Sequence, residues 1–161
     1  MTPKFNTATS SIIRPATPED LATIFVLERS IPSAAHWPES TYRGIFRQQD
    51  PKRIALVAVD KLGEIEAICG FVLARLAGHD CELENIFVAP QHQRRGLGSH
   101  LLQSLSAEAR TLNTTRIFLE VRESNAAPRA LYEKSGFAIT GRRPNYYSDP
   151  VDDAILYTLR L

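Results

Sequence analysis

The sequence predicts one domain of the mixed α/β (α+β) class, and three observations predict it. Its 161 residues, 43% of them hydrophobic, suffice for one sizeable core but not for two ordinary domains. Two apolar segments, residues 54–59 and 67–76, flank a short polar turn, which is typical of an antiparallel hairpin. Segments 81–88, 97–109 and 117–121 alternate between strand, helix and strand patterns, which indicates a β-α-β unit with two parallel strands.

The N-terminal segment differs in composition from the rest of the chain. Its first ten residues are polar, rich in Thr and Ser, and lack the apolar core of a secretion signal. We therefore expect a flexible tail at 1–10 and a folded domain at 11–161. The apolar residues at 11–14 predict the first strand of that domain.

Two helices are expected before the hairpin. The run Thr17-Pro18-Glu19-Asp20 combines an N-cap residue, a proline at the first helical position and early acidic residues, which together predict a helix start. The apolar spacing that follows continues this helix to Glu28. A second helix is predicted at 38–47, after which the hairpin strands join around residues 61–64.

The C-terminal half contains two further helix patterns. The helix at 97–109 carries its leucines and Ala109 on one stripe, as expected for a helix that packs on a sheet. The next helix has Ser124 or Asn125 as its cap, Pro128 in its first turn and Gly136 as its C-terminal stop.

Composition narrows the range of functions. The chain has 19 basic and 18 acidic residues, and this balance argues against nucleic acid or a membrane surface as a partner. No apolar run is long enough to cross a bilayer. Cys69 and Cys81 lie in apolar strand patterns, which favours reduced core thiols and a cytoplasmic protein. The four histidines show no metal-ligand spacing, so no metal site is expected.

The most informative motif joins the strand at 81–88 to the helix that follows it. The run Gln93-Arg94-Arg95-Gly96-Leu97-Gly98-Ser99 places a basic, glycine-bearing turn at a helix start, where unpaired N–H groups and the helix dipole favour an anion. The two glycines allow the backbone to approach a ligand closely. A dinucleotide-binding fold requires a third glycine and a later acidic residue, and a Walker A motif requires Gly-Lys-Ser/Thr. The turn therefore predicts a phosphate-bearing cofactor, with a solvent-exposed helix cap as the alternative.

Three carboxylates are candidates for a general base. Glu120 lies inside the apolar strand pattern at 117–121, where burial would make it a better proton acceptor than a surface glutamate. The alternative is an ion pair with Arg116 or Arg122. Glu82 and Glu84 share one face of the preceding strand by alternation, so they are rival or auxiliary bases.

The helix after the second parallel strand supplies two polar candidates. Asn125 offers an amide at the helix start, where it can bond to polar parts of a ligand. Tyr132 lies on the same side as Leu131, and by itself it would be interpreted as a core aromatic residue whose hydroxyl has a buried partner.

The order of these motifs resembles a known family. Over about residues 11–161, the chain resembles the GNAT superfamily of acetyl-CoA-dependent N-acetyltransferases. The motifs that carry the resemblance are, in order, a strand, the Gln93–Gly98 turn, a helix, Leu119-Glu120-Val121-Arg122, Ser124-Asn125-Ala126-Ala127 and Ala130-Leu131-Tyr132-Glu133-Lys134-Ser135-Gly136-Phe137. Trp37 and the segments 85–88, 142–147 and 152–154 are similar to bacterial ribosomal-protein alanine N-acetyltransferases, which modify protein N-termini. Two segments depart from that subfamily. Its Pro-Trp-Ser/Thr run is His36-Trp37-Pro38 here, and Pro144 lengthens its Arg-Arg-Asn-Tyr-Tyr run.

The resemblance implies a fold and a cofactor site. It implies a single mixed sheet of about seven strands with helices on both faces, in which the strands at 81–88 and 117–121 splay apart to hold acetyl-CoA. The residues implied to bind acetyl-CoA are Ile86, Phe87, Val88, Gln93, Arg94, Arg95, Gly96, Leu97, Gly98, Ser99, Asn125 and Tyr132.

The resemblance also implies catalytic and acceptor-binding residues. Glu120 would be the general base and Tyr132 the general acid, and the substrate-binding residues would be Trp37, Glu82, Glu84, Tyr146 and Tyr147. The expected reaction is direct acetyl transfer to a primary amine, with the α-amine of a protein N-terminus as the leading acceptor. The alternatives are a small-molecule amine acetyltransferase of the same fold and a non-catalytic acetyl-CoA-sensing module.

Overall fold

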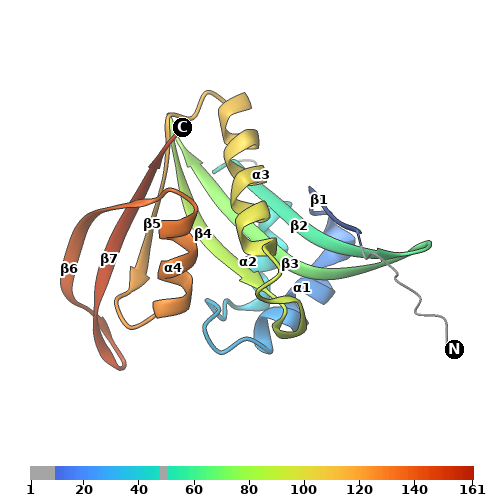
Figure 1. Cartoon of the computed structure of the whole chain (residues 1–161), viewed down its shortest axis with the longest axis horizontal. Coiled ribbons are helices and arrows are strands. Elements are labelled where there is room, and N and C mark those ends of the chain that lie inside the picture. Colours follow the sequence, from blue (N-terminus) through green and yellow to red (C-terminus); the bar gives the residue numbers. More distant parts are fainter. Residues whose placement is uncertain (1–9, 48–50) are drawn as a thin grey trace, which may run out of the picture.

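Figure 1 shows the computed structural model, which describes residues 10–47 and 51–161. In chain order these residues form β1 (Ser10–Pro15), a 3-10 turn (Pro18–Asp20), α1 (Leu21–Arg29), α2 (Glu39–Ile45), β2 (Arg53–Leu62), β3 (Ile65–Ala77), β4 (Asp80–Val88), a second 3-10 turn (Pro90–His92), α3 (Leu97–Thr111), β5 (Arg116–Arg122), α4 (Ala126–Lys134), β6 (Ala138–Ser148) and β7 (Val151–Arg160). The predicted tail at 1–10 lies outside the described residues, except for Ser10, which begins β1.

The described strands form one sheet of seven in the order β1-β2-β3-β4-β5-β7-β6. All neighbouring strands are antiparallel except β4 and β5, which are parallel. The sheet is mixed because α3 crosses over between β4 and β5, whereas β2 and β3 are joined by a short turn. This confirms the predicted single mixed sheet of about seven strands.

The parallel pair β4 and β5 separates along its length. The two strands are paired only near their start, from Asp80 with Arg116 to Glu82 with Phe118. Beyond these three pairs, β4 continues to Val88 and β5 to Arg122 without hydrogen bonding to each other. Figure 1 shows the strands diverging from their shared end. The prediction that this strand pair is splayed is therefore confirmed.

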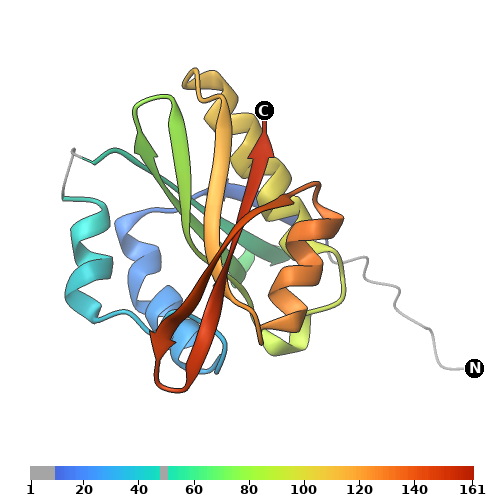
Figure 2. The same ribbon diagram turned by 90° about the vertical axis from the view of Figure 1, so that its left-hand side faces the viewer.

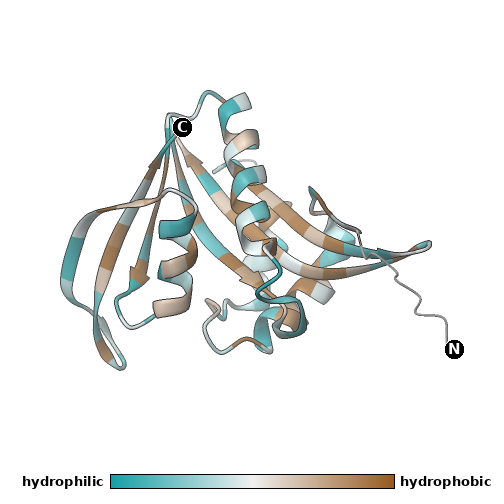
Figure 3. Cartoon of the chain, viewed as in Figure 1, coloured by the Kyte–Doolittle hydropathy of each residue, from teal (hydrophilic) through white to brown (hydrophobic). Residues whose placement is uncertain are grey.

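Helices cover both faces of the sheet, as predicted. α3 and α4 pack on one face, and α1 and α2 pack on the other (Figures 1 and 2). The core under α3 includes Leu101 and Ile117, whereas the core under α1 and α2 includes Ile24, Tyr42 and Phe71. Figure 3 shows apolar residues along the central strands and polar residues on the outer side of α3. Burial of both sheet faces is thus the main source of stability for this fold.

A bulge in β4 determines which of its side chains face which core. Asn85 pairs with Leu73 of β3, but Leu83 pairs with the next residue, Ala74, so Glu84 is an extra residue in β4. Leu83 packs in the core under α3, whereas Asn85 contacts residues of α1 and α2 on the opposite face. Regular alternation would place both residues on one face. The bulge therefore reverses the faces on which the side chains of β4 lie from Asn85 onward.

The helix ends differ slightly from those predicted. The first helix begins as the 3-10 turn, in which the Asp20 side chain accepts a hydrogen bond from the Thr17 backbone at 2.8 Å. The helix predicted at 38–47 is shorter, because Pro38 is its N-cap and Phe46 its C-cap. α3 continues two residues beyond the predicted end, to Thr111. Such differences at helix ends leave the positions of the site residues unchanged.

Two further observations concern the chemistry of the described residues. None of the helices formed by residues 10–47 and 51–161 is long and apolar enough to span a membrane. The same residues contain no group of three or more His, Cys, Asp or Glu side chains that could hold a metal ion. Cys69 and Cys81 are both buried and not disulfide-bonded, and burial raises the pKa of each thiol.

Candidate active site

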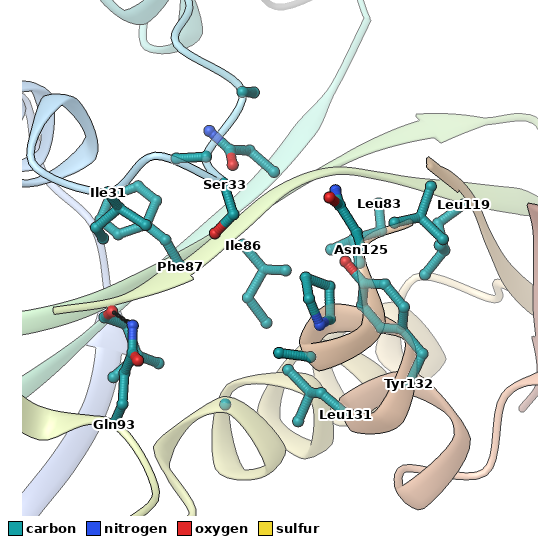
Figure 4. Close-up of a pocket in the computed structure, with 18 of the residues that line it drawn as sticks. Ile31, Ser33, Leu83, Ile86, Phe87, Gln93, Leu119, Asn125, Leu131 and Tyr132 are labelled. Carbon is teal, nitrogen blue, oxygen red and sulfur yellow. Dashed lines mark hydrogen bonds between the residues drawn. The ribbon is translucent and has the colours of Figure 1, made fainter. Parts of the chain in front are cut away.

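The divergence of β4 and β5 opens a cleft of about 1020 Å³. Its walls come from the end of β4, from β5, from the start of α3, from α4 and from the segment between α1 and α2. Figure 4 shows Ile86 of β4 facing Leu131 and Tyr132 of α4 across this space. The volume is at the upper end of the range that small-molecule and cofactor sites occupy.

The turn between β4 and α3 forms one end of the cleft. Arg94 and Gly96 both have left-handed backbone angles, with φ of 61° and 80°, and Gly96 is the N-cap of α3. The Gln93 side chain donates a hydrogen bond to the Val88 carbonyl at 3.0 Å, which closes the turn. A helix that begins at Leu97 leaves its first N–H groups without intrahelical acceptors, so the turn presents donors and positive charge to the cleft.

The cofactor-binding residues predicted from the sequence lie at this cleft with one exception. The eleven that line it are Ile86, Phe87, Val88, Gln93, Arg94, Gly96, Leu97, Gly98, Ser99, Asn125 and Tyr132. Arg95 is not among the lining residues, and its guanidinium lies 3.6 Å from the Asp60 carboxylate on β2.

Glu120 lies on the open face of β5. The burial expected for Glu120 is only partial, because β5 alternates between buried and half-buried residues and the Glu120 side chain is 25% exposed. Its ion-pair partner is Arg143 of β6, at 3.1 Å, and not Arg116 or Arg122 as the alternative proposed. Arg116 pairs with Asp80 instead. Glu120 is also among the lining residues of the cleft.

Glu82 and Glu84 share one face of the sheet, as predicted, and both contact Arg75 of β3. Glu84 is also held by two nitrogens of Arg53, at 2.8 and 3.3 Å, and its side chain is 14% exposed. Glu84 lines the cleft, but Glu82 does not. Both carboxylates therefore have arginine partners within the sheet face.

Tyr132 of α4 is 7% exposed and borders the cleft. Its ring packs against Phe137 and Tyr157, with centroids 5.8 and 6.0 Å away. The interpretation as a core aromatic residue holds for this ring but not for the hydroxyl, which has no hydrogen-bond partner among the described residues. Burial raises the pKa of Tyr132, so the phenol keeps its proton at neutral pH.

The aromatic residues predicted to bind the acceptor are in three different environments. Tyr147 lines the cleft, and its ring lies 4.1 Å from the Arg122 guanidinium. Burial, and to a lesser extent the charge of Glu120, raise the pKa of Tyr147. Tyr146 is 51% exposed beside it, outside the cleft lining, and Trp37 packs against Tyr42 at 5.9 Å in the core under α1.

Sequence reasoning missed a buried hydrogen-bond network below the cleft. Glu28 of α1 is fully buried, and its Oε1 accepts hydrogen bonds from the Tyr42 hydroxyl at 2.5 Å, from the Asn85 side chain at 3.3 Å and from the Trp37 backbone at 3.2 Å. A charged or amide residue inside an apolar pattern, as at Glu28 and Asn85, was the available signal. The network ties the segment between α1 and α2 to the β4 bulge.

That segment was also missed as a wall of the cleft. Ile31, Ser33, Ala34 and Ala35 line it, although nothing in their local pattern indicates a site. His92 of the second 3-10 turn is a further lining residue, and its Nε2 lies 3.1 Å from the Asp60 carboxylate.

Comparison with known proteins agrees with this geometry. The model of the acetyltransferase (GNAT) family matches residues 19–137. The [ribosomal protein bS18]-alanine N-acetyltransferase of Salmonella typhimurium is 38% identical over 125 residues, which cover 76% of this chain and 80% of that protein. The Escherichia coli K12 protein of the same name is 35% identical over 149 residues, which cover 85% of this chain and 96% of that protein.

Solved structures show the same fold. The crystal structure of the ribosomal-protein-S18-alanine N-acetyltransferase from Escherichia coli matches with a TM-score of 0.77 and 30% identity, covering 94% of each chain. Arabidopsis thaliana NAA60 in complex with acetyl-CoA matches with a TM-score of 0.81 and 16% identity, over 94% of this chain and 99% of that one.

The fold, the cleft and the family match together define the class: the chain belongs to the GNAT family of acetyltransferases. Within that family its similarity is to enzymes named ribosomal-protein alanine N-acetyltransferases, and the chain is an N-acetyltransferase. The alternative of a non-catalytic acetyl-CoA-sensing module is therefore wrong.

Proposed function

We propose that this enzyme transfers the acetyl group of acetyl-CoA directly to the α-amine of a protein N-terminus, as the names of its ribosomal-protein alanine N-acetyltransferase relatives suggest. The observation that carries the proposal is the single cleft that is lined by Glu120, Tyr132 and the turn at Gln93–Ser99. A ribosomal acceptor and two unpaired buried thiols both suit a cytoplasmic enzyme.

The cleft has the features that acetyl-CoA requires. Beyond Glu82, the edge of β4 that faces β5 has no strand partner, so its backbone groups near Ile86 and Val88 are available to the pantetheine amides and the thioester carbonyl. The turn at Gln93–Ser99 would hold the diphosphate with backbone N–H groups. Asn125 adds a side-chain amide on the opposite wall. Bound acetyl-CoA supplies the activated acetyl group.

The close packing of α3 on α4 supports a test of the cofactor site. A Cβ atom at Gly98 would lie 2.9 Å from Leu131 of α4, so the Gly98→Val substitution should push Leu131 into the cleft. We expect the Kd of CoA to rise about tenfold, which is ~1.4 kcal/mol. The matched control is Gly44→Val in α2, where nothing lies within 4 Å of the added Cβ. Calorimetric titration that shows wild-type affinity in a folded Gly98→Val variant would contradict this cofactor placement.

Among the three carboxylates, Glu120 is best suited to be the base. Glu84 is held by two nitrogens of Arg53, and Glu82 lies outside the cleft. Glu120 has one ion-pair contact, with Arg143, whose side chain is 54% exposed, so the Glu120 carboxylate is accessible to an amine. In the proposed reaction Glu120 takes the proton that the attacking amine loses, directly or through water.

Tyr132 is suited to be the acid. Its hydroxyl is free of hydrogen bonds to the described residues, and burial raises its pKa, so it keeps a proton to donate. As the amine nitrogen bonds to the acetyl carbon and the carbon–sulfur bond breaks, Tyr132 would donate its proton to the sulfur. The proton that Glu120 receives balances the one that Tyr132 gives, and no covalent enzyme intermediate is needed.

The acceptor's own chemistry favours an N-terminus. An α-amine has a pKa of about 7.7–8.0 and a lysine amine about 10.4, so near pH 7 the α-amine is several hundred-fold richer in the neutral, nucleophilic form. The acceptor end of the cleft is bordered by Tyr147 and by the segment that includes Ile31 and Ala34, which suits an N-terminal residue with a small apolar side chain.

The test of this function is an acetylation assay followed by mass spectrometry. An Ala-led hexapeptide should be acetylated once, on its α-amine, and the same peptide with a blocked N-terminus but a free lysine should not react. Turnover of a small amine such as spermidine without turnover of the peptide would instead establish the small-molecule alternative.

A further inference from the structure

We propose that the Arg143 guanidinium occupies the place on Glu120 that the acceptor's ammonium group must take, so that Arg143 is a positioning residue that every acceptor displaces. The inference rests on the proposed function, in which Glu120 receives the proton of the acceptor amine. It adds that the Arg143 guanidinium and the acceptor's ammonium group compete for the Glu120 carboxylate, and that this competition helps to determine which amines bind.

The ion pair is placed where the acceptor would arrive. Nη2 of Arg143 lies 3.1 Å from Oε1 of Glu120, and the side chains are 54% and 25% exposed. Arg143 comes from β6 and is not among the lining residues of the cleft, whereas Glu120 is one of them. A guanidinium and a primary ammonium are both cationic N–H donors, so they compete for the same carboxylate.

The neighbouring ion pairs are more firmly held. Glu84 is bound through two nitrogens of Arg53, and their side chains are only 14% and 16% exposed. Arg142, the residue before Arg143, pairs with two carboxylates, Glu123 and Asp153. By comparison, Arg143 has a single carboxylate partner among the described residues. Its ion pair is therefore the one that a ligand can exchange at low cost.

Arg122, the second cationic side chain near Glu120, already has other partners. Arg122 donates to the Pro150 carbonyl at 2.9 Å and to the Asp149 carbonyl at 3.1 Å, and its guanidinium lies over the ring of Tyr147. These bonds hold Arg122 at the β6–β7 turn. Displacement by the acceptor would consequently affect Arg143 and leave Arg122 in place.

β6 also provides a position for the displaced guanidinium. The pairing of β6 with β7 is irregular between Arg143 and Tyr147, and Asn145 has a left-handed φ of 51°. The Asn145 backbone N–H donates to Asp153 at 2.8 Å, which anchors this irregular segment. The Arg143 guanidinium already lies 5.5 Å from the centroid of the exposed Tyr146 ring, so it can leave Glu120 and keep a cation–π contact at the surface.

The test compares two peptides by calorimetric titration into enzyme saturated with CoA, which cannot acetylate them. One is an Ala-led hexapeptide with a free α-amine, and the other is the same peptide with an acetylated N-terminus. In the Arg143→Gln variant the Kd of the free-amine peptide should fall about two- to five-fold, as expected when an exposed ion pair no longer competes. The Kd of the capped peptide should not change.

Three variants serve as controls. Arg143→Lys keeps a cation beside Glu120 and should bind the free-amine peptide much as the wild type does. Arg142→Gln removes the same charge one residue earlier, away from Glu120, and should not tighten binding. In a Glu120→Gln background, Arg143→Gln should have no effect, because the carboxylate for which the two cations compete is absent.

Several results would overturn the proposal. Weaker or unchanged binding of the free-amine peptide to Arg143→Gln would mean that Arg143 does not compete with the ammonium. Equal tightening of both peptides would indicate a wider cleft instead of a released carboxylate, and a lack of binding to Arg143→Gln would likewise contradict the competition. The assay needs no turnover, so an enzyme that binds as expected but acetylates no peptide would contradict the proposed function alone.

Discussion

The Tyr132→Phe variant should have a kcat about 100-fold lower than the wild type, with little change in the Kd of CoA. The substitution removes the only proton that this side chain can donate but keeps the ring that packs against Phe137 and Tyr157. Loss of a general acid typically lowers the rate 10²–10⁴-fold. Steady-state kinetics with an Ala-led peptide, together with calorimetric titration of CoA, would measure both quantities.

The matched control is Tyr147→Phe, because Tyr147 is the other phenol among the lining residues of the cleft. It should change the KM of the peptide more than kcat, since Tyr147 lies beside Arg122 at the part of the cleft that we propose binds the acceptor. If Tyr147→Phe lowers kcat more than Tyr132→Phe does, then the acid is wrongly assigned.

The raised pKa of Tyr132 also predicts a pH dependence. An acid catalyst is active while it is protonated, and a phenol loses its proton only as the pH passes through its pKa, which is about 10 without perturbation. Burial raises the pKa of Tyr132 above that ordinary value, so the active form should persist throughout the neutral and mildly alkaline range. A kcat profile that is flat from about pH 8 to pH 9.5 is expected, and an alkaline fall in this range that Tyr132→Phe abolishes would contradict it.

The second large effect is expected for Glu120→Gln, which should lower kcat/KM at pH 7 about 100-fold or more. The substitution keeps the shape of the side chain but removes its capacity to accept the proton of the amine. The loss should become smaller as the pH rises above about 8, because a growing fraction of the α-amine is then already neutral. A pH series of kcat/KM for both enzymes would measure this convergence.

Glu84→Gln is the matched control for this prediction. Glu84 lines the same cleft but is held by Arg53 and Arg75. The Glu84→Gln substitution should therefore lower the free energy of unfolding, and its effect on kcat/KM should be smaller than that of Glu120→Gln. A folded Glu84→Gln variant with the larger rate defect would transfer the role of base from Glu120 to Glu84.

The glycine-bearing turn at Gln93–Ser99 and the helix α3 were predictable because their signals are local. Gly96 needs a left-handed φ of 80° at the start of α3, and the glycine is visible in the sequence without reference to any other segment. The strand and helix patterns on either side are likewise local, and a β-α-β connection then leaves little choice but a parallel pair. The resemblance to the GNAT superfamily followed from these same motifs.

The partners of the site residues were not predictable in this way. The sequence suggested Arg116 or Arg122 for Glu120, since these are near in the chain, but the partner is Arg143, which β7 and β6 bring alongside β5. The face on which Asn85 lies could not be predicted either, because alternation assumes a regular strand and the bulge at Glu84 interrupts it.

The sequence by itself determined the class of fold and the glycine-bearing turn before α3, because glycine conformations, helix caps and hydrophobic periods depend on near neighbours in the chain. Glu120 as candidate base and Tyr132 as candidate acid came from the resemblance to the GNAT superfamily. Only the tertiary structure decided which carboxylate is accessible, which cation faces it and which loop forms a further wall of the cleft. Those properties depend on strand order, on a register shift and on the packing of α1 and α2, which bring together side chains that lie far apart in the chain.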